Sequence, residues 1–200
     1  MKSIRILFLI VFLAVLMPIP VRAQTPTPPP DIRLILNSMT PEERVGQLFL
    51  VTFKGIDTGT TSHIYDLMVR YHIGGVVLLA QNDNFVAAPD TVAQAHTLID
   101  NLQRLEWDTF QNPVINPLTG KEFDSTYVPL FVGVTQEGNG FPTDQIINGL
   151  TPLPSEMAIG ATWNPSLAER VGEVRGRELS ALGFNLLFGP SLDVLEAPVV

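Results

Sequence analysis

The feature that most constrains the fold is an even alternation of short apolar runs with amphipathic helical segments. Each apolar run is continuous and favours β-structure, as expected for a strand that is buried on both faces. Strands of this kind that alternate with helices are typical of a parallel sheet covered by helices. The sequence contains four such runs: Leu48–Phe53, Gly74–Leu79, Val128–Val134 and Phe184–Phe188.

The segments around these runs carry helix signals. Thr40 is predicted to cap a short helix, because Pro41 suits its first turn and Glu43 stands at the capping-box position. Apolar residues spaced three and four apart predict further helical faces, and Asn164 and Gly183 are typical helix boundaries. The three further helices are expected at Ile64–Tyr71, Val92–Leu102 and Asn164–Gly183.

Together these elements predict an α/β fold, the first half of a (β/α)8 TIM-type barrel with about four β/α units. The first strand is not followed by Gly-x-Gly-x-x-Gly or a Walker loop, which argues against a dinucleotide or nucleotide fold. A complete barrel has eight strands in about 250 residues, so we expect residues 31–200 to be an incomplete barrel that continues beyond the chain end. Residues 106–127 carry turn signals and are expected to form a surface insertion at the bottom of the barrel.

The N-terminus is typical of an exported protein. Lys2 and Arg5 precede the apolar run Ile6–Met17, and Val21-Arg22-Ala23 resembles a cleavage site. We therefore predict that residues 1–23 are a signal peptide, and that the mature protein is secreted or extracytoplasmic, with no stable membrane insertion after cleavage. An N-terminal membrane anchor that is not cleaved is the alternative.

The proline-rich segment that follows is expected to be a linker. Residues 24–30 consist of Pro and Thr after Gln24, and such a segment is extended and does not pack. The folded domain is then expected to span residues 31–200.

Composition excludes several classes of partner. The formal net charge is −8, and no cluster of Lys and Arg is present, which argues against nucleic acid. The chain has no cysteine, so it has neither a disulfide nor a thiolate metal site. His63, His72 and His96 do not stand at metal-ligand spacing. We expect no metal and no cofactor.

Polar residues follow two of the predicted strands, at the ends where a barrel builds its active site. Glu137 and Asp193 are the two carboxylates there, and Thr135 and Asn139 lie beside Glu137. Carboxylates and amides at such a position suit sugar hydroxyls, so a carbohydrate substrate is expected to contact all four residues. The alternative is that Glu137 caps its own loop and Asp193 caps a turn.

Several segments resemble glycoside hydrolase family 3, in the same order along the chain. The resemblance implies a barrel-like N-terminal domain in a protein that removes terminal β-linked sugars with retention of configuration. The third-strand motif of that family, Asp-x-Glu-Gly-Gly, corresponds to Thr135 to Asn139 here. The segments that carry the resemblance are Gly46–Phe49, Ile73–Leu78, Thr151–Thr162, Glu173–Asn185 and Gly189–Val194.

This resemblance implies a secreted glycosidase of the β-N-acetylhexosaminidase or β-glucosidase type as the full-length protein. Its nucleophile and acid/base are expected beyond Val200, so residues 1–200 alone are expected to be inactive. The sequence departs from the family at Thr135, which replaces an Asp, and at Asn139, which replaces a Gly; the Arg that usually follows is absent before Leu150. These departures favour the alternative, a non-catalytic carbohydrate-binding barrel of the same family.

Overall fold

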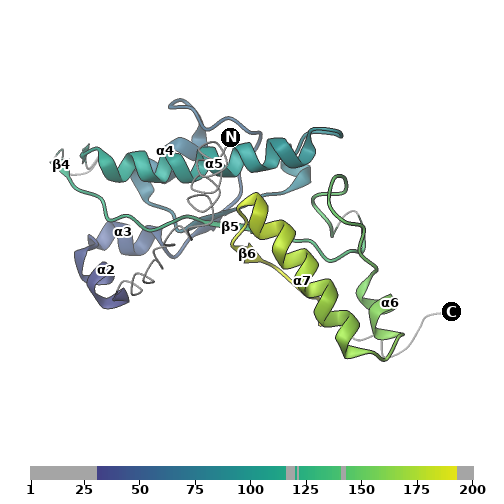
Figure 1. The fold of residues 1–200 in the computed structure, drawn as a ribbon. Coiled ribbons are helices and arrows are strands. Elements are labelled where there is room, and N and C mark those ends of the chain that lie inside the picture. The colour runs from purple at the N-terminus through teal and green to yellow at the C-terminus, as the bar shows by residue number, and fades with distance from the viewer. Residues whose placement is uncertain (1–30, 116–119, 121, 141–142, 193–200) are drawn as a thin grey trace, which may run out of the picture. The chain divides into compact units, whose positions relative to one another are not determined.

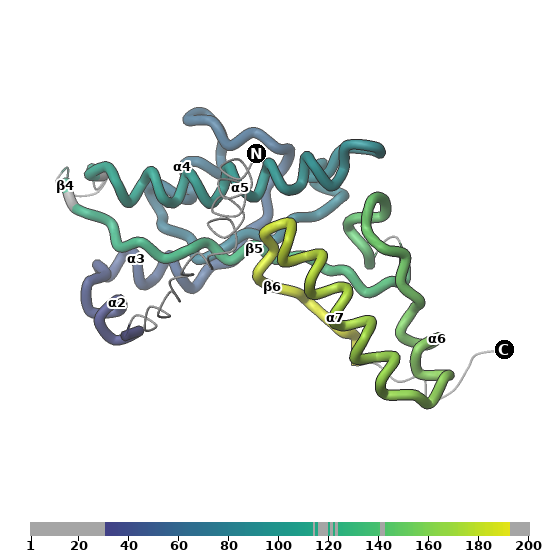
Figure 2. The backbone as a smooth tube through the Cα atoms, viewed as in Figure 1, coloured from purple at the N-terminus to yellow at the C-terminus, as the bar shows by residue number. Residues whose placement is uncertain are grey.

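A computed structural model describes residues 31–115, 120, 122–140 and 143–192. The chain divides into two units, Met1–Asp31 and Ile32–Val200. The described elements belong to the second unit, and Figure 2 follows its backbone from the N-terminal to the C-terminal side. The predicted signal peptide, the linker and Asp193 lie outside the described residues. Within the described part of the chain, no helix has the length and apolarity needed to cross a membrane.

The centre of the fold is a parallel sheet of four strands in the order β1-β2-β5-β6 (Figure 1). Each strand pairs in parallel with its neighbour, and each connection contains a helix. This arrangement confirms the predicted α/β class. The paired strands are shorter than the apolar runs that predicted them: β1 is Leu50–Val51, β2 is Gly75–Val77, β5 is Phe131–Val134 and β6 is Leu186–Leu187.

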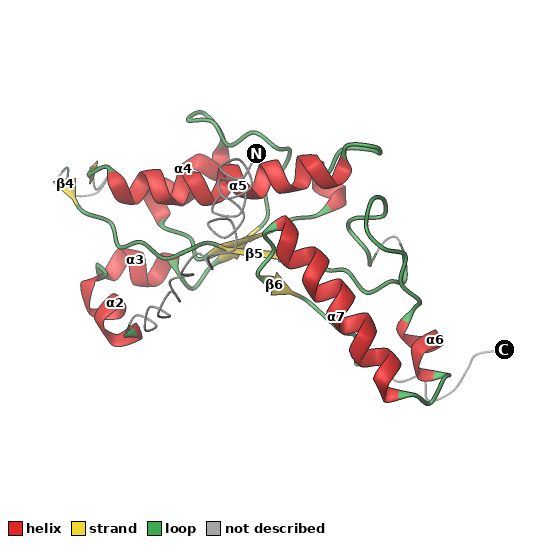
Figure 3. Ribbon diagram, in the orientation of Figure 1, coloured by secondary structure: helices red, strands yellow, loops and turns green. Residues whose placement is uncertain are grey.

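The predicted helices are present, and Thr40, Asn164 and Gly183 are helix caps, as expected from the sequence. Thr40 and Glu43 form a complete capping box, and Ser62 and Asn164 each accept a hydrogen bond at a helix start. Gly183 ends the last helix with a positive φ of 98°, which favours glycine. These helices are α3 Pro41–Gly46, α4 His63–Tyr71, α5 Thr91–Gln111 and α7 Pro165–Leu182, the last two being the longest in Figure 3.

Three short helical segments were not expected from the sequence. They are α2 Ile32–Ser38, the 3-10 turn η1 Ala80–Asn82 and α6 Glu156–Gly160. Each is one or two turns long, which is too short for a clear helical period.

The helices bury one face of the sheet. Val76, Leu78, Val132 and Val134 are fully buried beneath side chains of α4, α5 and α7. The side chains that complete this core are Ile64 and Met68 of α4, Ala95, Leu98, Ile99 and Leu102 of α5, and Leu179 and Leu182 of α7.

In the described part of the chain, side chains on the opposite face of the sheet are exposed. Leu50, Gly75 and Phe131 are paired neighbours on that face, where Leu50 is 44% and Phe131 is 48% exposed. The expectation of burial on both faces is therefore wrong for this unit, and it is also wrong for Leu48, which is exposed. The residues on this face of the sheet are nevertheless apolar, as expected of a sheet that faces the interior of a barrel.

Gly46, the last residue of α3, lies against the backbone of the chain before β2. A Cβ atom at Gly46 would overlap the carbonyl oxygens of Tyr71 and His72, which are backbone atoms and cannot rotate away. Gly172, within α7, has no atom near its hypothetical Cβ. An added methyl group would therefore clash with the backbone at Gly46 and would fit without a clash at Gly172.

Gly46→Ala in the full-length protein is expected to lower the free energy of unfolding by about 3 kcal/mol or more, because the backbone must move. Gly172→Ala is expected to raise it by about 0.5–1 kcal/mol, because alanine favours a helix interior. Denaturant unfolding of both variants checks the pair. Equal changes in the free energy of unfolding for the two variants would contradict the close approach of Gly46 to the Tyr71 and His72 carbonyl oxygens.

The segment 106–127 is only partly the loop that its turn signals predict. Helix α5 continues to Gln111, so residues 106–111 are helical, and Glu106 and Thr109 are buried in this part of the helix. The remainder contains an antiparallel hairpin of β3 Val114–Ile115 and β4 Glu122–Phe123. The rings of Trp107, Phe110 and Tyr127 pack together with centroids 5.0–5.7 Å apart.

Two carboxylates, Glu43 and Glu106, are buried and interact electrostatically. The Glu43 carboxylate accepts hydrogen bonds from the Thr40 N–H at 2.7 Å and the Thr126 N–H at 2.6 Å, which ties α3 to the chain before β5. Burial, and then the Glu43 carboxylate, raise the pKa of Glu106 to about 7. Burial also lowers the pKa of His72, against the opposing effect of Glu43 and Glu42.

Glu106→Gln is expected to stabilise the full-length protein above pH 7. The folded pKa of Glu106 lies above its ordinary value of 4.5, so the folded state binds this proton more tightly. The contribution of the Glu106 carboxyl to the free energy of unfolding is therefore fully present below about pH 4.5 and is lost as the pH rises to about 7. The shift in the pKa of Glu106 corresponds to a change of at most roughly 3 kcal/mol in the free energy of unfolding.

Chemical unfolding from pH 4 to pH 8 measures this effect. The difference between Glu106→Gln and the unmodified protein should grow with pH, whereas Glu122→Gln, at an exposed position in the hairpin, should change nothing. A difference that does not depend on pH would show that Glu106 does not titrate in this range.

Candidate functional site

The carboxyl ends of the four strands lie at one edge of the sheet, because all four strands are parallel. At this edge, three polar side chains each connect the ends of two neighbouring strands. They are Asn84, Gln145 and Glu137, and each makes its contacts to a different pair of loops.

Asn84 connects the ends of β1 and β2. Its side chain is fully buried, and its amide nitrogen donates to the carbonyl oxygens of Phe53 at 3.1 Å and Gly55 at 2.7 Å. Its amide oxygen accepts from the Leu79 N–H at 2.9 Å. The buried amide is well satisfied, so it fixes the loop after β1 against the end of β2.

Gln145 connects the ends of β2 and β5. Its side-chain oxygen accepts from the Ala80 N–H at 2.7 Å, and its nitrogen donates to the Thr135 hydroxyl at 3.0 Å. The Thr135 hydroxyl, predicted to contact sugar, is therefore already an acceptor in this network. It keeps its own proton for one further hydrogen bond.

Glu137 connects the ends of β5 and β6. Its carboxylate is buried and accepts from the Ser191 N–H at 2.9 Å and from the Asn139 side-chain nitrogen at 3.3 Å. A Cβ atom at Gly189 would lie 3.1 Å from the Glu137 carboxylate, so the glycine permits this close approach. Glu137 thus holds the loop that follows β6.

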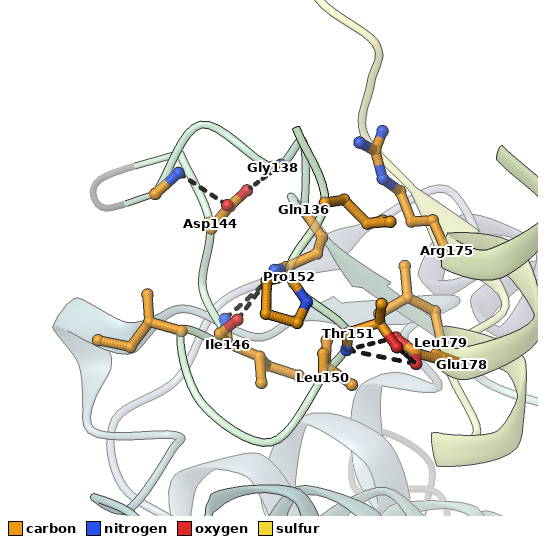
Figure 4. Close-up of a pocket in the computed structure, with 13 residues that line it drawn as sticks. Gln136, Gly138, Asp144, Ile146, Leu150, Thr151, Pro152, Arg175, Glu178 and Leu179 are labelled. Atoms are coloured by element: carbon orange, nitrogen blue, oxygen red, sulfur yellow. Dashed lines mark hydrogen bonds between the residues drawn. The ribbon is translucent and has the colours of Figure 1, made fainter. Parts of the chain in front are cut away.

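Asp144 folds the loop that carries Glu137. One of its carboxylate oxygens accepts from the N–H groups of Glu137 and Gly138, and the other accepts from Gly140 at 2.8 Å. Gly138 has a positive φ of 84°, and the bond from its N–H to Asp144 is drawn in Figure 4. The Asp144 carboxylate is therefore a structural anchor for the loop.

The structure brings together three of the four residues predicted to contact sugar. Thr135, Glu137 and Asn139 lie in the single loop after β5, and Asn139 is exposed there. Asp193 lies outside the described residues, although Ser191, two positions earlier, is bonded to Glu137. Sugar contact by these four residues stays a prediction.

A cavity of about 210 Å³ lies between this loop region and α7 (Figure 4). Arg175 of α7 lines it and donates from Nη2 to the carbonyl oxygen of Glu137 at 2.7 Å. Its Nη1 lies 3.9 Å from the Glu156 carboxylate. The pKa of Glu156 is raised by desolvation first, then by Glu137, and also by Asp144, while Arg175 lowers it.

Sequence reasoning missed Asn84, Gln145 and Arg175. The partners of the first two lie in other loops, and nothing in the local sequence indicates them. Arg175 had a signal, because it lies midway between Val171 and Leu179 on the apolar stripe of α7. Within the described ranges, no three metal-ligating side chains gather at one point.

The sequence of this chain is similar to a known protein family and to several of its members. The model described as "Glycosyl hydrolase family 3 N terminal domain" matches residues 40–199. A β-N-acetylglucosaminidase/β-glucosidase of Cellulomonas fimi is 28% identical over 82% of this chain and 23% of its own length. β-Hexosaminidase A of Pseudoalteromonas piscicida is 30% identical over 66% of this chain and 19% of its own.

A solved structure has the same fold. The glycoside hydrolase family 3 β-N-acetylglucosaminidase of Paenibacillus sp. str. FPU-7 matches with a TM-score of 0.60 and 29% identity, over 78% of this chain and 25% of that chain. The present chain thus spans about a quarter or less of the length of these relatives.

Proposed function

Because the chain belongs to glycosyl hydrolase family 3, whose N-terminal domain it matches over residues 40–199, we propose that the full-length protein hydrolyses terminal β-linked sugars with retention of configuration. The observation that carries the proposal is this match along nearly the whole folded unit. Relatives named as β-N-acetylglucosaminidase, β-glucosidase and β-hexosaminidase support an aryl or glycosyl β-glucoside or β-N-acetylhexosaminide as substrate.

We place the sugar at the carboxyl ends of β5 and β6. Asn139 is exposed there, and the Glu137 carboxylate has acceptor positions beyond those used by Ser191 and Asn139. Thr135 keeps a hydroxyl proton to donate, and Asp193 follows two positions after Ser191 in the sequence. Hydrogen bonds to a charged acceptor contribute roughly 1.5–3 kcal/mol each, so the two carboxylates are proposed as the stronger contacts.

The catalytic pair is proposed to come from the rest of the full-length protein. Retaining hydrolysis needs a nucleophile and an acid/base about 5 Å apart. At the end of β5, the Asp144 carboxylate is held by backbone N–H groups and the Glu137 carboxylate holds the β6 loop. Both carboxylates therefore support the site, and we assign neither of them the chemical step.

Export is a further part of the proposal. The charged start at Lys2 and Arg5, the apolar run Ile6–Met17 and the small residue Ala23 support a cleaved signal peptide. The mature protein would then act on its substrate outside the cytoplasm.

Hydrolysis of aryl glycosides by the full-length protein tests the proposed activity. We expect turnover of an aryl β-glucoside or an aryl β-N-acetylglucosaminide, and no turnover of the matching α-anomers. The specific observation that favours a binding barrel is Thr135, whose hydroxyl replaces a carboxylate and is held by Gln145. Calorimetric binding of the free sugar without turnover of any aryl glycoside would support that second function.

A further inference from the structure

Arg175 is a buried cation on the helix behind the proposed site. Its side chain is nine-tenths buried, on the stripe of α7 that also carries Leu179. A guanidinium in such a position is strongly destabilising unless it is paired or hydrogen-bonded. The groups that contact the Arg175 guanidinium therefore indicate its role.

Those contacts lead to the loop after β5. The Nη2 atom of Arg175 donates to the Glu137 carbonyl oxygen at 2.7 Å, which is a short, charge-assisted hydrogen bond. Glu156 lies 3.9 Å from Nη1, which is a longer contact than a hydrogen bond. Burial of the guanidinium is thus compensated mainly at the peptide of Glu137.

Glu137 is consequently held at three points. Asp144 accepts from its N–H, Arg175 donates to its carbonyl oxygen, and its own carboxylate holds the Ser191 N–H. Beside this loop lies the cavity of about 210 Å³, which is lined by Gln136 and Gly138, the sequence neighbours of Glu137 (Figure 4). Polar anchors on both sides therefore hold the Glu137 peptide beside this cavity.

We propose that Arg175 is a positioning residue, which fixes the peptide of Glu137 and, through the Glu137 carboxylate, the chain after β6 at Ser191. The proposal rests on the proposed function of this edge as a sugar site. Arg175 acts from behind the loop, and its effect on the substrate passes through Glu137.

Kinetics of the full-length protein on an aryl β-glycoside test this role. Arg175→Met is expected to lower kcat/KM by about 10- to 100-fold, because small displacements of positioned groups have effects of this size. Arg177→Met removes the same charge at an exposed position of α7 and should stay within about twofold. Arg175→Lys keeps a donor and should recover part of the loss. An Arg175→Met variant that matches Arg177→Met would overturn the proposal.

Hydrogen exchange gives a second readout that does not depend on turnover. In Arg175→Met, the amides of Gly138, Gly140 and Ser191 should exchange about tenfold faster or more, while the Leu78 amide in the sheet stays unchanged. Arg175→Met with Glu156→Gln removes the buried guanidinium together with the carboxylate 3.9 Å from it, so this double variant allows the same measurement if the single variant unfolds.

The two readouts separate this inference from the proposed function. Unchanged exchange at the three loop amides in the folded variant would overturn the positioning role, whatever the activity. A full-length protein that turns over no β-glycoside but shows the faster exchange would overturn the proposed function and support the role of Arg175.

Discussion

Glu137→Ala in the full-length protein is expected to lower kcat/KM on an aryl β-glycoside by about a hundredfold or more. The carboxylate connects the ends of β5 and β6 through the Ser191 N–H at 2.9 Å and orients the Asn139 side chain. Alanine removes both contacts and leaves the Ser191 N–H without this acceptor. A displacement of about 1 Å at a site of this kind has an effect of this order.

Two further variants show whether the carboxylate acts as described. Glu137→Gln keeps an acceptor for the Ser191 N–H and should lose much less activity than Glu137→Ala. Glu169→Ala removes a carboxylate from an exposed position of α7 and should leave kcat/KM unchanged. A Glu137→Ala variant with less than about a threefold change would show that the link between β5 and β6 is not required.

Residues 31–200 expressed as a separate polypeptide are expected to self-associate. The exposed sheet face presents Leu50, Phe131 and Phe188, which are 44%, 48% and 39% exposed. In the described sheet, β1 and β6 are the edge strands, and exposed edges and apolar patches lead to association. Light scattering after size-exclusion chromatography should therefore give a mass well above that of one chain.

A matched pair of substitutions identifies the surface responsible. Leu50→Thr with Phe131→Thr makes the exposed sheet face more polar and should shift the population towards monomer. The exposed pair Leu34→Thr with Ile56→Thr, outside the sheet, should have a smaller effect. A monomeric, cooperatively unfolding polypeptide without these substitutions would contradict the expectation.

The order and type of the main elements could be predicted because their signals are local. The capping box at Thr40 and Glu43 and the positive φ at Gly183 depend on neighbouring residues only. Strand ends could not be predicted as well, since apolar runs do not show where pairing stops. Leu48 belongs to such a run, yet it precedes the paired residues of β1 and is exposed.

The part of the candidate site that depends on local sequence could also be predicted. Thr135, Glu137 and Asn139 follow a strand directly, so their position at the sheet edge follows from the parallel topology. The roles of Gln145 and Arg175 depend on partners brought close only by the tertiary fold: Gln145 reaches Ala80, and Arg175 reaches Glu137. No local pattern contains that information.

The most direct test of the account is the anomeric configuration of the sugar first released by the full-length protein. Proton NMR during hydrolysis of an aryl β-glycoside, recorded before the free sugar mutarotates, measures it. A retaining β-glycosidase releases the β-anomer first, and the α-anomer follows by mutarotation. Initial release of the α-anomer, or no release of sugar from any β-glycoside, would contradict a retaining β-glycosidase built on this fold.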